Sequence, residues 1–326
     1  MHRRTVLAAT AGLTAPAIPA MAQAPTPAPA PAPAGQAPGF YRFKVGAMTV
    51  TVVYDGQAPR PNPTRGFVRN ATPEQVEATL RAQGLDPSVL TNPFSVAVVQ
   101  TPRGTVMFDS GNGPQTDPNA RTGQLIANLA AAGLRPDAVD VVASTHFHGD
   151  HIGGLLDAAG TAAFPRARIV VPEREWTFWL SEENAARAPD AMRPAFANVR
   201  RRFAPYDGKV ERVNEGFEPL PGVRMVATNG HAPGHASWHL SDGGAQAFVL
   251  GDLTSRPEIN LTNPGWHAIV DMDPVMAEAT RRRMFDQLAT DRIRAVGYHW
   301  PFPANGHVLK EADGYRFVPA EWSSVV

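Results

Sequence analysis

A cluster of histidine and aspartate side chains directly after an apolar strand constrains this chain more than any other feature. The segment Thr-His-Phe-His-Gly-Asp-His (145–151) follows an apolar run (139–143) and precedes a helical stretch. Residues i and i+2 of an extended loop project to the same side, so His146 and His148 can hold one metal ion. Asp150 and His151, where the chain turns into the helix, can face a second ion. The segment therefore predicts a metal site at the end of a strand.

A solvated polar loop without an ion is the alternative interpretation of this segment. Imidazoles crowded this closely would repel one another once protonated and would form a poor core, which favours metal binding. The chain contains no cysteine, so thiolate ligands and a cysteine nucleophile are excluded. Any metal must be held by histidine, aspartate or glutamate.

Further ligands are expected where later apolar runs end, because a site built across a sheet draws on several strands. The candidates that follow such runs are His231 and His235, Asp252, and His299. Five of these histidines together with the two aspartates would suit two borderline divalent ions with open positions for water, as in metal-assisted hydrolysis.

Charge and hydropathy exclude two classes of partner. Lys+Arg and Asp+Glu both number 30 in the 326 residues, so the chain has no net field to attract nucleic acid or anionic lipid. After the first residues, no apolar run reaches the ~20 residues that a membrane-spanning helix needs. We therefore expect no nucleic-acid partner and no membrane span.

Three regions are expected along the chain. Residues 1–22 contain Arg3-Arg4, a mild apolar run and a small-x-small site, which is typical of an export signal and resembles the twin-arginine type. An ordinary secretory signal is the alternative, and both place the mature protein in the periplasm or outside the cell. Residues 23–39 are rich in proline and alanine and predict an extended spacer. The catalytic domain is expected over 40–326.

The domain alternates strand and helix patterns, so an α+β fold with sheets flanked by helices is expected. A hairpin is predicted over 41–54. Thr72-Pro73-Glu74-Gln75 predicts a capped helix start, and Gly84 its end. Further helices are predicted over 152–159, 193–203 and 273–289.

The motifs resemble those of the metallo-β-lactamase-fold hydrolases. The resemblance rests on His146-x-His148-x-Asp150-His151, Gly234-His235, Gly251-Asp252 and His299, and it covers essentially everything after the spacer. It implies an αββα sandwich of two mixed β-sheets with outer helices. It also implies that His146, His148 and His235 hold one metal, that Asp150, His151 and His299 hold the other, and that Asp252 bridges them.

Within that family the chain is most similar to the methyl parathion hydrolase branch, which is related to dinuclear N-acyl homoserine lactonases. The supporting segments are Glu173-Arg174-Glu175 with Phe178-Trp179-Leu180-Ser181, 298–303 and 314–319. One position departs from the lactonases, many of which carry a tyrosine three residues after the bridging aspartate. Here that residue is Ser255.

The resemblance implies a hydrolase that cleaves lactones, carboxylic esters or phosphotriesters with a hydroxide bridging two divalent ions. Zinc is the first expectation for the metal, with manganese, cobalt or iron as alternatives, and Asp150 and Asp252 are the expected catalytic carboxylates. Such an enzyme acts on small molecules and is compatible with a homodimer. The alternatives are a glyoxalase-II-like thioesterase, a di-iron oxidoreductase and a metal-binding protein without catalysis.

The remaining candidates each have a structural alternative. His231 orients a ligand or caps its loop. Asp109, at the end of a strand, is expected to orient a metal-bound histidine, with capping of its turn as the alternative. The run Arg281-Arg282-Arg283 is interpreted as a solvated helix face. A set of mostly aromatic residues either lines the substrate pocket or packs in the core: Trp176, Phe178, Trp179, Phe196, Ser255, Trp300 and Phe302.

Overall fold

The computed structural model describes residues 36–326, and the folded unit runs from Pro38 to Val326. The predicted export signal (1–22) and all but the last residues of the predicted spacer (23–39) lie outside the described residues. Within 36–326, no helix combines the length and the apolar character that crossing a membrane requires.

Seven strands form the first sheet, in the order β1-β2-β3-β4-β5-β6-β7. β1 to β4 pair antiparallel and β4 to β7 pair parallel. The strands are β1 (Phe40–Val45), β2 (Met48–Pro61), β3 (Val89–Thr101), β4 (Gly104–Phe108), β5 (Val141–Ala143), β6 (Arg168–Pro172) and β7 (Val210–Val213).

Six strands form the second sheet, in the order β13-β12-β11-β10-β9-β8. Only the β10–β11 pair is parallel. The strands are β8 (Val223–Ala227), β9 (Ala236–Asp242), β10 (Ala245–Val249), β11 (Arg294–Val296), β12 (Asn305–Lys310) and β13 (Tyr315–Pro319).

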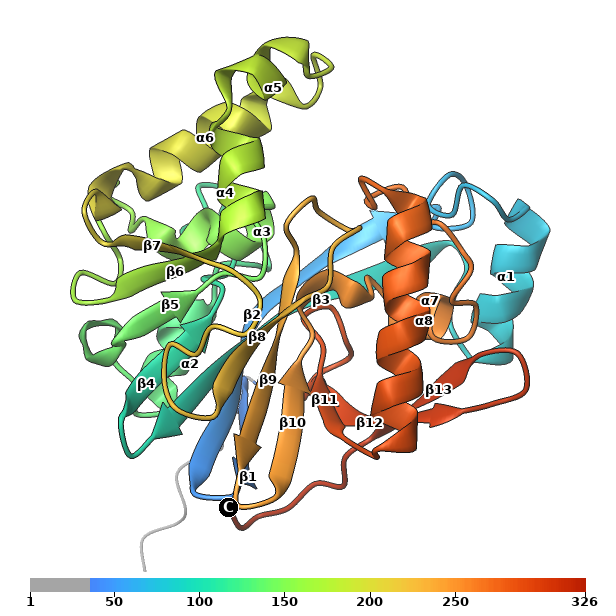
Figure 1. The fold of residues 1–326 in the computed structure, drawn as a ribbon. Coiled ribbons are helices and arrows are strands. Elements are labelled where there is room, and N and C mark those ends of the chain that lie inside the picture. The colour runs from blue at the N-terminus through green and yellow to red at the C-terminus, as the bar shows by residue number, and fades with distance from the viewer. Residues whose placement is uncertain (1–35) are drawn as a thin grey trace, which may run out of the picture. The chain divides into compact units, whose positions relative to one another are not determined.

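Helices cover the outer faces of the two sheets (Figure 1). Those that pack on the first sheet are α2 (Leu125–Ala131), α4 (Glu173–Leu180) and α6 (Arg193–Phe203), and α8 (Pro274–Thr290) packs on the second sheet. The other helices are α1 (Pro73–Ala82), α3 (Gly149–Ile152), α5 (Glu182–Arg187) and α7 (Pro257–Asn260), with short 3₁₀ turns at 136–138, 153–155, 204–206 and 251–253.

Alternation along the strands separates two cores. On β3, Val96 and Val98 face the helices on the outside of the first sheet, while Ala97 and Val99 face the second sheet. Because successive strand residues point to opposite faces, both sides of the first sheet can be buried. These four layers confirm the expected αββα sandwich of two mixed sheets.

Local signals placed several elements correctly. Thr72 accepts from the backbone N–H of Gln75 and the Gln75 side chain accepts from the backbone N–H of Thr72, which is the predicted capping box. The predicted hairpin is β1–β2, and the helix predicted over 193–203 is α6.

The helix predicted over 152–159 is wrong. The chain instead forms the four-residue α3 and a 3₁₀ turn, and then extends at Leu156. Gly153 and Gly154 pack against the backbone that follows β4, where a Cβ on Gly154 would lie 1.9 Å from the carbonyl oxygen of Ser110. This contact holds the turn close to the sheet, and Leu156 then pairs with Ala162 in a β-bridge.

Candidate metal centre

Four loops bring the candidate ligands together. Each loop leaves the end of a strand: β5 leads to His146 and His148, and β8 leads to His231. β10 leads to Asp252, and β11 leads to His299. Asp150 and His151 lie in α3, directly after the first pair. The strands therefore deliver side chains that are far apart in sequence to one place.

The side chains form two adjoining clusters. His146, His148, His231 and Asp252 make one cluster, and Asp150, His151 and His299 make the other. In each cluster one potential ligand atom per residue lies within 4.8 Å of the others. In the first cluster the His231 Nε2 atom is 3.0 Å from His148 Nδ1.

The Asp252 carboxylate lies between the two clusters. Its Oδ1 atom is 3.2 Å from His151 Nε2, and its Oδ2 atom is 3.1 Å from His299 Nε2. The same Oδ2 atom is 3.3 Å from His231 Nε2 in the first cluster. A single carboxylate therefore approaches nitrogen atoms of both clusters, which is the arrangement expected of a shared ligand.

Three buried atoms of the clusters have no hydrogen-bond partner among the described residues: His146 Nε2, His151 Nε2 and Asp252 Oδ1. Buried polar groups are almost always paired, so three orphans that converge on one point call for a missing partner. Imidazole nitrogen and carboxylate oxygen are the donors that suit zinc and similar divalent ions. The residues present thus fit divalent metal ions.

Electrostatics also fits a cationic occupant. Burial, together with the charges of neighbouring histidines, holds the pKa of His146 well below its usual value. Burial lowers the pKa of His151 as well, but the carboxylates of Asp252 and Asp150 outweigh burial and raise that pKa well above the usual value. The carboxylates thus favour positive charge at this point, which a metal ion would supply without protonating the imidazoles.

The expectation that His235 is a ligand is corrected by its hydrogen bonds. Its Nε2 atom accepts from the backbone N–H of Asp252 at 2.9 Å, and its Nδ1 atom lies 2.8 Å from Thr228 Oγ1. Both ring nitrogens are therefore engaged, and His235 lies outside both clusters. His231, for which the sequence left two roles open, lies in the first cluster instead of His235.

A buried ion pair fixes the His231 ring from behind. His231 Nδ1 is 3.1 Å from Asp271 Oδ1, and Asp271 Oδ2 is 2.7 Å from Arg281 Nη1. Arg281 is 1% exposed, so the interpretation of the arginine run as a solvated face is wrong for this residue. Helical periodicity does not reveal this because Asp271 lies in the loop before α8.

Asp109 holds His151 as its position after β4 suggested. Its Oδ2 atom is 2.8 Å from His151 Nδ1 and 2.8 Å from Thr145 Oγ1, while Oδ1 accepts from the backbone N–H of Thr145 at 2.7 Å. Asp109 has a φ of 65°, in the left-handed region that non-glycine residues seldom adopt. This conformation turns the carboxylate toward His151 and leaves the Nε2 atom of that histidine facing the cluster.

Sequence comparison identifies the family to which this fold belongs. Residues 92–295 match the model of the metallo-beta-lactamase superfamily. The chain belongs to the metallo-beta-lactamase superfamily. All proposed ligands except His299 lie inside the matched range.

Two curated relatives of this superfamily member illustrate the range of similarity. N-acyl homoserine lactonase AiiA from Bacillus thuringiensis subsp. kurstaki is 26% identical over 253 residues, which cover 72% of this chain and 89% of that protein. The uncharacterized protein YobT from Bacillus subtilis (strain 168) is 30% identical over 94 residues. That match covers 29% of this chain and only 38% of YobT.

Solved structures of two hydrolases share the fold. The hydrolase AbOPH of the beta lactamase superfamily has a TM-score of 0.82 at 25% identity, covering 89% of this chain and 100% of that one. The dizinc quorum-quenching lactonase AidC, solved with a product of its reaction, has a TM-score of 0.81 at 22% identity. It covers 88% of this chain and 99% of AidC.

The residues predicted to line the substrate pocket fall into two groups, one buried in the cores and one partly exposed. Trp179, Phe196 and Trp300 are buried at 1%, 1% and 0% exposure and belong to the cores. Trp300 Nε1 donates to Thr254 Oγ1 and its ring packs on Phe317, so its prediction as a pocket residue is wrong. Trp179 packs in the core, and its ring also lies beside a candidate ligand, with a centroid 6.3 Å from that of His148.

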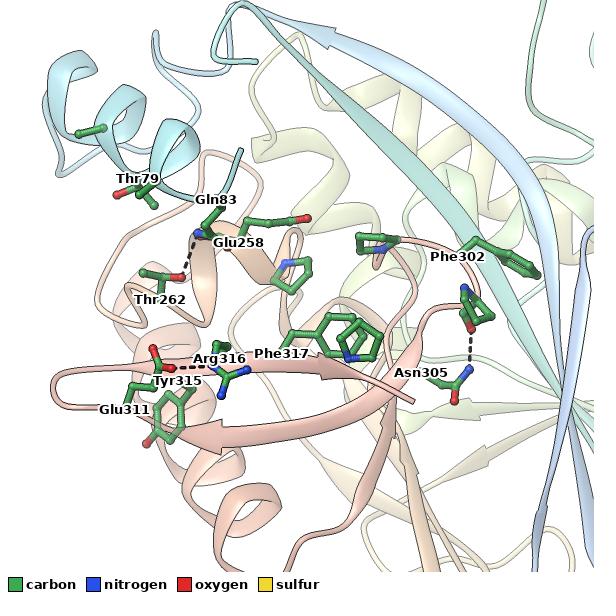
Figure 2. Close-up of a pocket in the computed structure, with 16 residues that line it drawn as sticks. Thr79, Gln83, Glu258, Thr262, Phe302, Asn305, Glu311, Tyr315, Arg316 and Phe317 are labelled. Carbon is green, nitrogen blue, oxygen red and sulfur yellow. Dashed lines mark hydrogen bonds and ion pairs between the residues drawn. The ribbon is translucent and has the colours of Figure 1, made fainter. Parts of the chain in front are cut away.

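Partly exposed members of the set remain candidates for contact with substrate. Trp176 and Phe178 on α4 are half-buried and Phe302 is 38% exposed, whereas Ser255 is 8% exposed. Phe302 forms part of the wall of a 660 Å³ cavity between α1, α7 and β13 (Figure 2). The cavity lining contains none of the clustered ligands, and its Gln83 and Thr262 side chains bond to each other. It is therefore separate from the clustered ligands, although residues 301–303 of its lining follow His299 in the chain.

Two charged residues, Glu175 and Arg60, were not predicted from the sequence as part of the site. Glu175, which belongs to a segment typical of the family, is fully buried behind the ligand loops. Arg60 is the penultimate residue of β2 and is half-buried, with its guanidinium 4.8 Å from the centre of the Phe67 ring. It has no ion pair within 36–326. Burial lowers its pKa, and the charge of Asp150 offsets only part of that effect. A lone arginine or glutamate carries no spacing signal that would have revealed either role.

Proposed function

We propose that this protein is a dinuclear metal-dependent hydrolase that cleaves lactones, carboxylic esters or phosphotriesters. The observation that carries the proposal is the position of Asp252, whose two oxygens approach nitrogen atoms of both clusters. We propose that His146, His148 and His231 hold one ion, that Asp150, His151 and His299 hold the second, and that Asp252 is shared.

Two divalent ions in these positions would supply Lewis acidity, which makes water acidic near neutral pH and polarises the oxygen of the bond to be cleaved. The protein's own part is positioning. His146 and His151 are fully buried, which excludes bulk water from the inner side of the centre. The Asp150 side chain is 28% exposed, so it faces the open side, where a substrate can enter.

Asp150 is the carboxylate best placed to move a proton. Its Oδ2 atom lies 3.6 Å from His151 Nε2 and 3.5 Å from His299 Nε2, while Oδ1 has no hydrogen-bond partner within 36–326. Oδ1 can accept a proton released during attack and return it to the leaving oxygen. The Tyr298 hydroxyl donates to the backbone carbonyl of Asp150 at 2.6 Å and so fixes the position of this residue.

Lactones, carboxylic esters and phosphotriesters share an electrophilic centre and a leaving oxygen, so the same ligands serve all three. Similarity to the lactonase AiiA over 72% of the chain supports a lactone or ester substrate. The likeness to the hydrolase AbOPH supports hydrolysis without choosing among the three.

Metal analysis and substrate turnover test the proposal together. Protein purified without added metal is analysed for its elements and assayed with lactones, aryl esters, aryl phosphotriesters and a thioester. We expect about two ions per chain and turnover of at least one of the first three classes. Asp252→Ala should lose an ion and nearly all turnover, with Asp252→Asn as the milder change. A fully active enzyme with one ion per chain would refute the dinuclear centre.

A further inference from the structure

A single buried carboxylate joins the two loops that carry the histidines of the first cluster. Glu175 lies on α4, is 0% exposed, and belongs to neither cluster. Its Oε1 atom accepts from the backbone N–H of Phe147 at 3.0 Å, and its Oε2 atom accepts from the backbone N–H of Gly234 at 2.7 Å. Phe147 stands between His146 and His148, and Gly234 lies in the loop that carries His231.

The loop that carries His231 approaches α4 so closely that the residues at the contact cannot be larger. A Cβ on Gly234 would lie 2.1 Å from the backbone nitrogen of Glu175, so only glycine lets this loop approach α4. A third donor, Trp179 Nε1, reaches Oε1 at 2.6 Å, one turn further along the same helix. All three partners of the carboxylate are N–H groups, so each oxygen must act as an acceptor.

We propose that Glu175 is a positioning residue that sets the separation of the two ligand loops, and thereby the affinity of the first cluster for its ion. The inference rests on the proposed metal centre and assigns to α4 a role in building it. Glu175 bonds to both loops that carry the histidines of the first cluster, but it makes no bond to Asp150, His151 or His299. The second cluster should therefore depend on it much less.

Glu175→Gln is the sharpest substitution because it keeps the shape and changes one acceptor into a donor. A glutamine presents one oxygen and one NH₂ group, so an NH₂ group must face either the Gly234 N–H or the Phe147 and Trp179 N–H groups. In either orientation the NH₂ group faces a backbone N–H of one ligand loop, so the hydrogen bond to that loop is lost. The two ligand loops are then no longer joined through residue 175. Glu173→Gln is the matched control, since Glu173 lies on the same helix, is only partly buried, and bonds to Thr177.

Zinc release to a chromogenic chelator measures the affinity of each ion without using catalysis. In Glu175→Gln we expect the affinity for one of the two ions to fall about 10- to 100-fold, with the other within about threefold of wild type. Glu173→Gln should match wild type. Excess zinc should restore occupancy of the weakened cluster, which a general folding defect would not allow. Unchanged release of both ions, or equal weakening of both, would overturn the inference.

Hydrogen exchange in the wild-type protein tests the same link if the variant does not fold. The amides of Phe147 and Gly234 should stay protected after zinc is stripped, because Glu175 rather than the metal holds them. Rapid exchange of both amides in the stripped protein would show that the ions hold the loops, and the inference would be wrong. A wild-type protein that binds two ions but hydrolyses no substrate would refute the proposed function and leave the role of Glu175 standing.

Discussion

The His235 Nε2 atom accepts a hydrogen bond of 2.9 Å from the backbone N–H of Asp252. This bond ties the loop after β8 to the loop after β10 and fixes the carboxylate that both clusters share. Gly251, just before Asp252, has a φ of 56°, and a Cβ there would lie 2.8 Å from His235 Nε2. The second histidine of this loop therefore supports the metal centre from outside it.

His231 and His235 should respond differently to alanine substitution. His231→Ala should bind one ion fewer than wild type and lose turnover by about a thousandfold or more, because a ligand nitrogen is removed. His235→Ala should keep its ion content but lose about 1 to 3 kcal/mol of unfolding free energy, because the Asp252 N–H is left unpaired. Elemental analysis and denaturant unfolding measure the two effects. Loss of an ion in His235→Ala alone would reverse the assignment.

Asp109→Asn should weaken metal binding in the second cluster. The carboxylate accepts from His151 Nδ1, and this bond keeps His151 Nε2 directed at the cluster. An amide can present its NH₂ group to Nδ1 and favour the wrong tautomer, so affinity for one ion should fall about 10- to 100-fold. The exposed Asp117→Asn is the control. Chelator titration that shows both variants equal to wild type would remove Asp109 from the centre.

Arg281→Met should destabilise the fold strongly, and Arg282→Met should not. Removing Arg281 leaves the Asp271 carboxylate buried without its cation, which typically costs about 3 to 5 kcal/mol. The neighbouring Arg282 is exposed and pairs with Glu278 four residues before it, a contact that contributes about 0.3 to 0.5 kcal/mol. Urea unfolding of both variants measures the difference. Similar stabilities would mean that Asp271 finds another partner.

Arg60→Gln should reduce the preference for substrates that carry a negative charge. The guanidinium has no carboxylate partner within 36–326 and lies within the field of Asp150. We expect kcat/KM for an anionic aryl ester to fall about threefold to tenfold relative to a neutral one, or roughly 1 kcal/mol. Arg65→Gln, an exposed arginine nearby, is the control. An unchanged ratio would show that substrates do not reach Arg60.

Rates should depend steeply on the leaving group, because Ser255 stands where many related lactonases offer a tyrosine hydroxyl. Ser255 is 8% exposed and has a short side chain, so it offers little stabilisation to a leaving oxygen. Activated aryl esters should be cleaved faster than alkyl esters, and Ser255→Tyr should shift preference toward lactones. The measurement is kcat/KM across an aryl ester series and an acyl homoserine lactone. A flat dependence, with lactones already preferred, would show that another residue supplies the donor.

Local sequence was enough for the features that depend on a few neighbouring residues. The capping box at Thr72, the β1–β2 hairpin and the grouping of His146, His148, Asp150 and His151 follow from spacing within one turn or loop. Strand ends also predicted that Asp252 and His299 would join them, because polar side chains after buried strands collect at one edge of a sheet. These features depend on local spacing or on the position of a residue just after a buried strand.

Only the tertiary structure decided which histidine of the loop after β8 enters the cluster and what fixes the ligands in place. His231 and His235 have similar local surroundings in the sequence, and the choice depends on a backbone N–H that comes 17 residues after His235. Burial of Glu175 and Arg281 likewise depends on Gly234 and Asp271, which lie on other elements. A residue's own neighbours determine its local conformation, but distant groups determine whether a charge is buried and paired. The sequence therefore predicted a metal site at these strand ends, and the packing of separate loops determined that His231, and not His235, joins the clustered side chains.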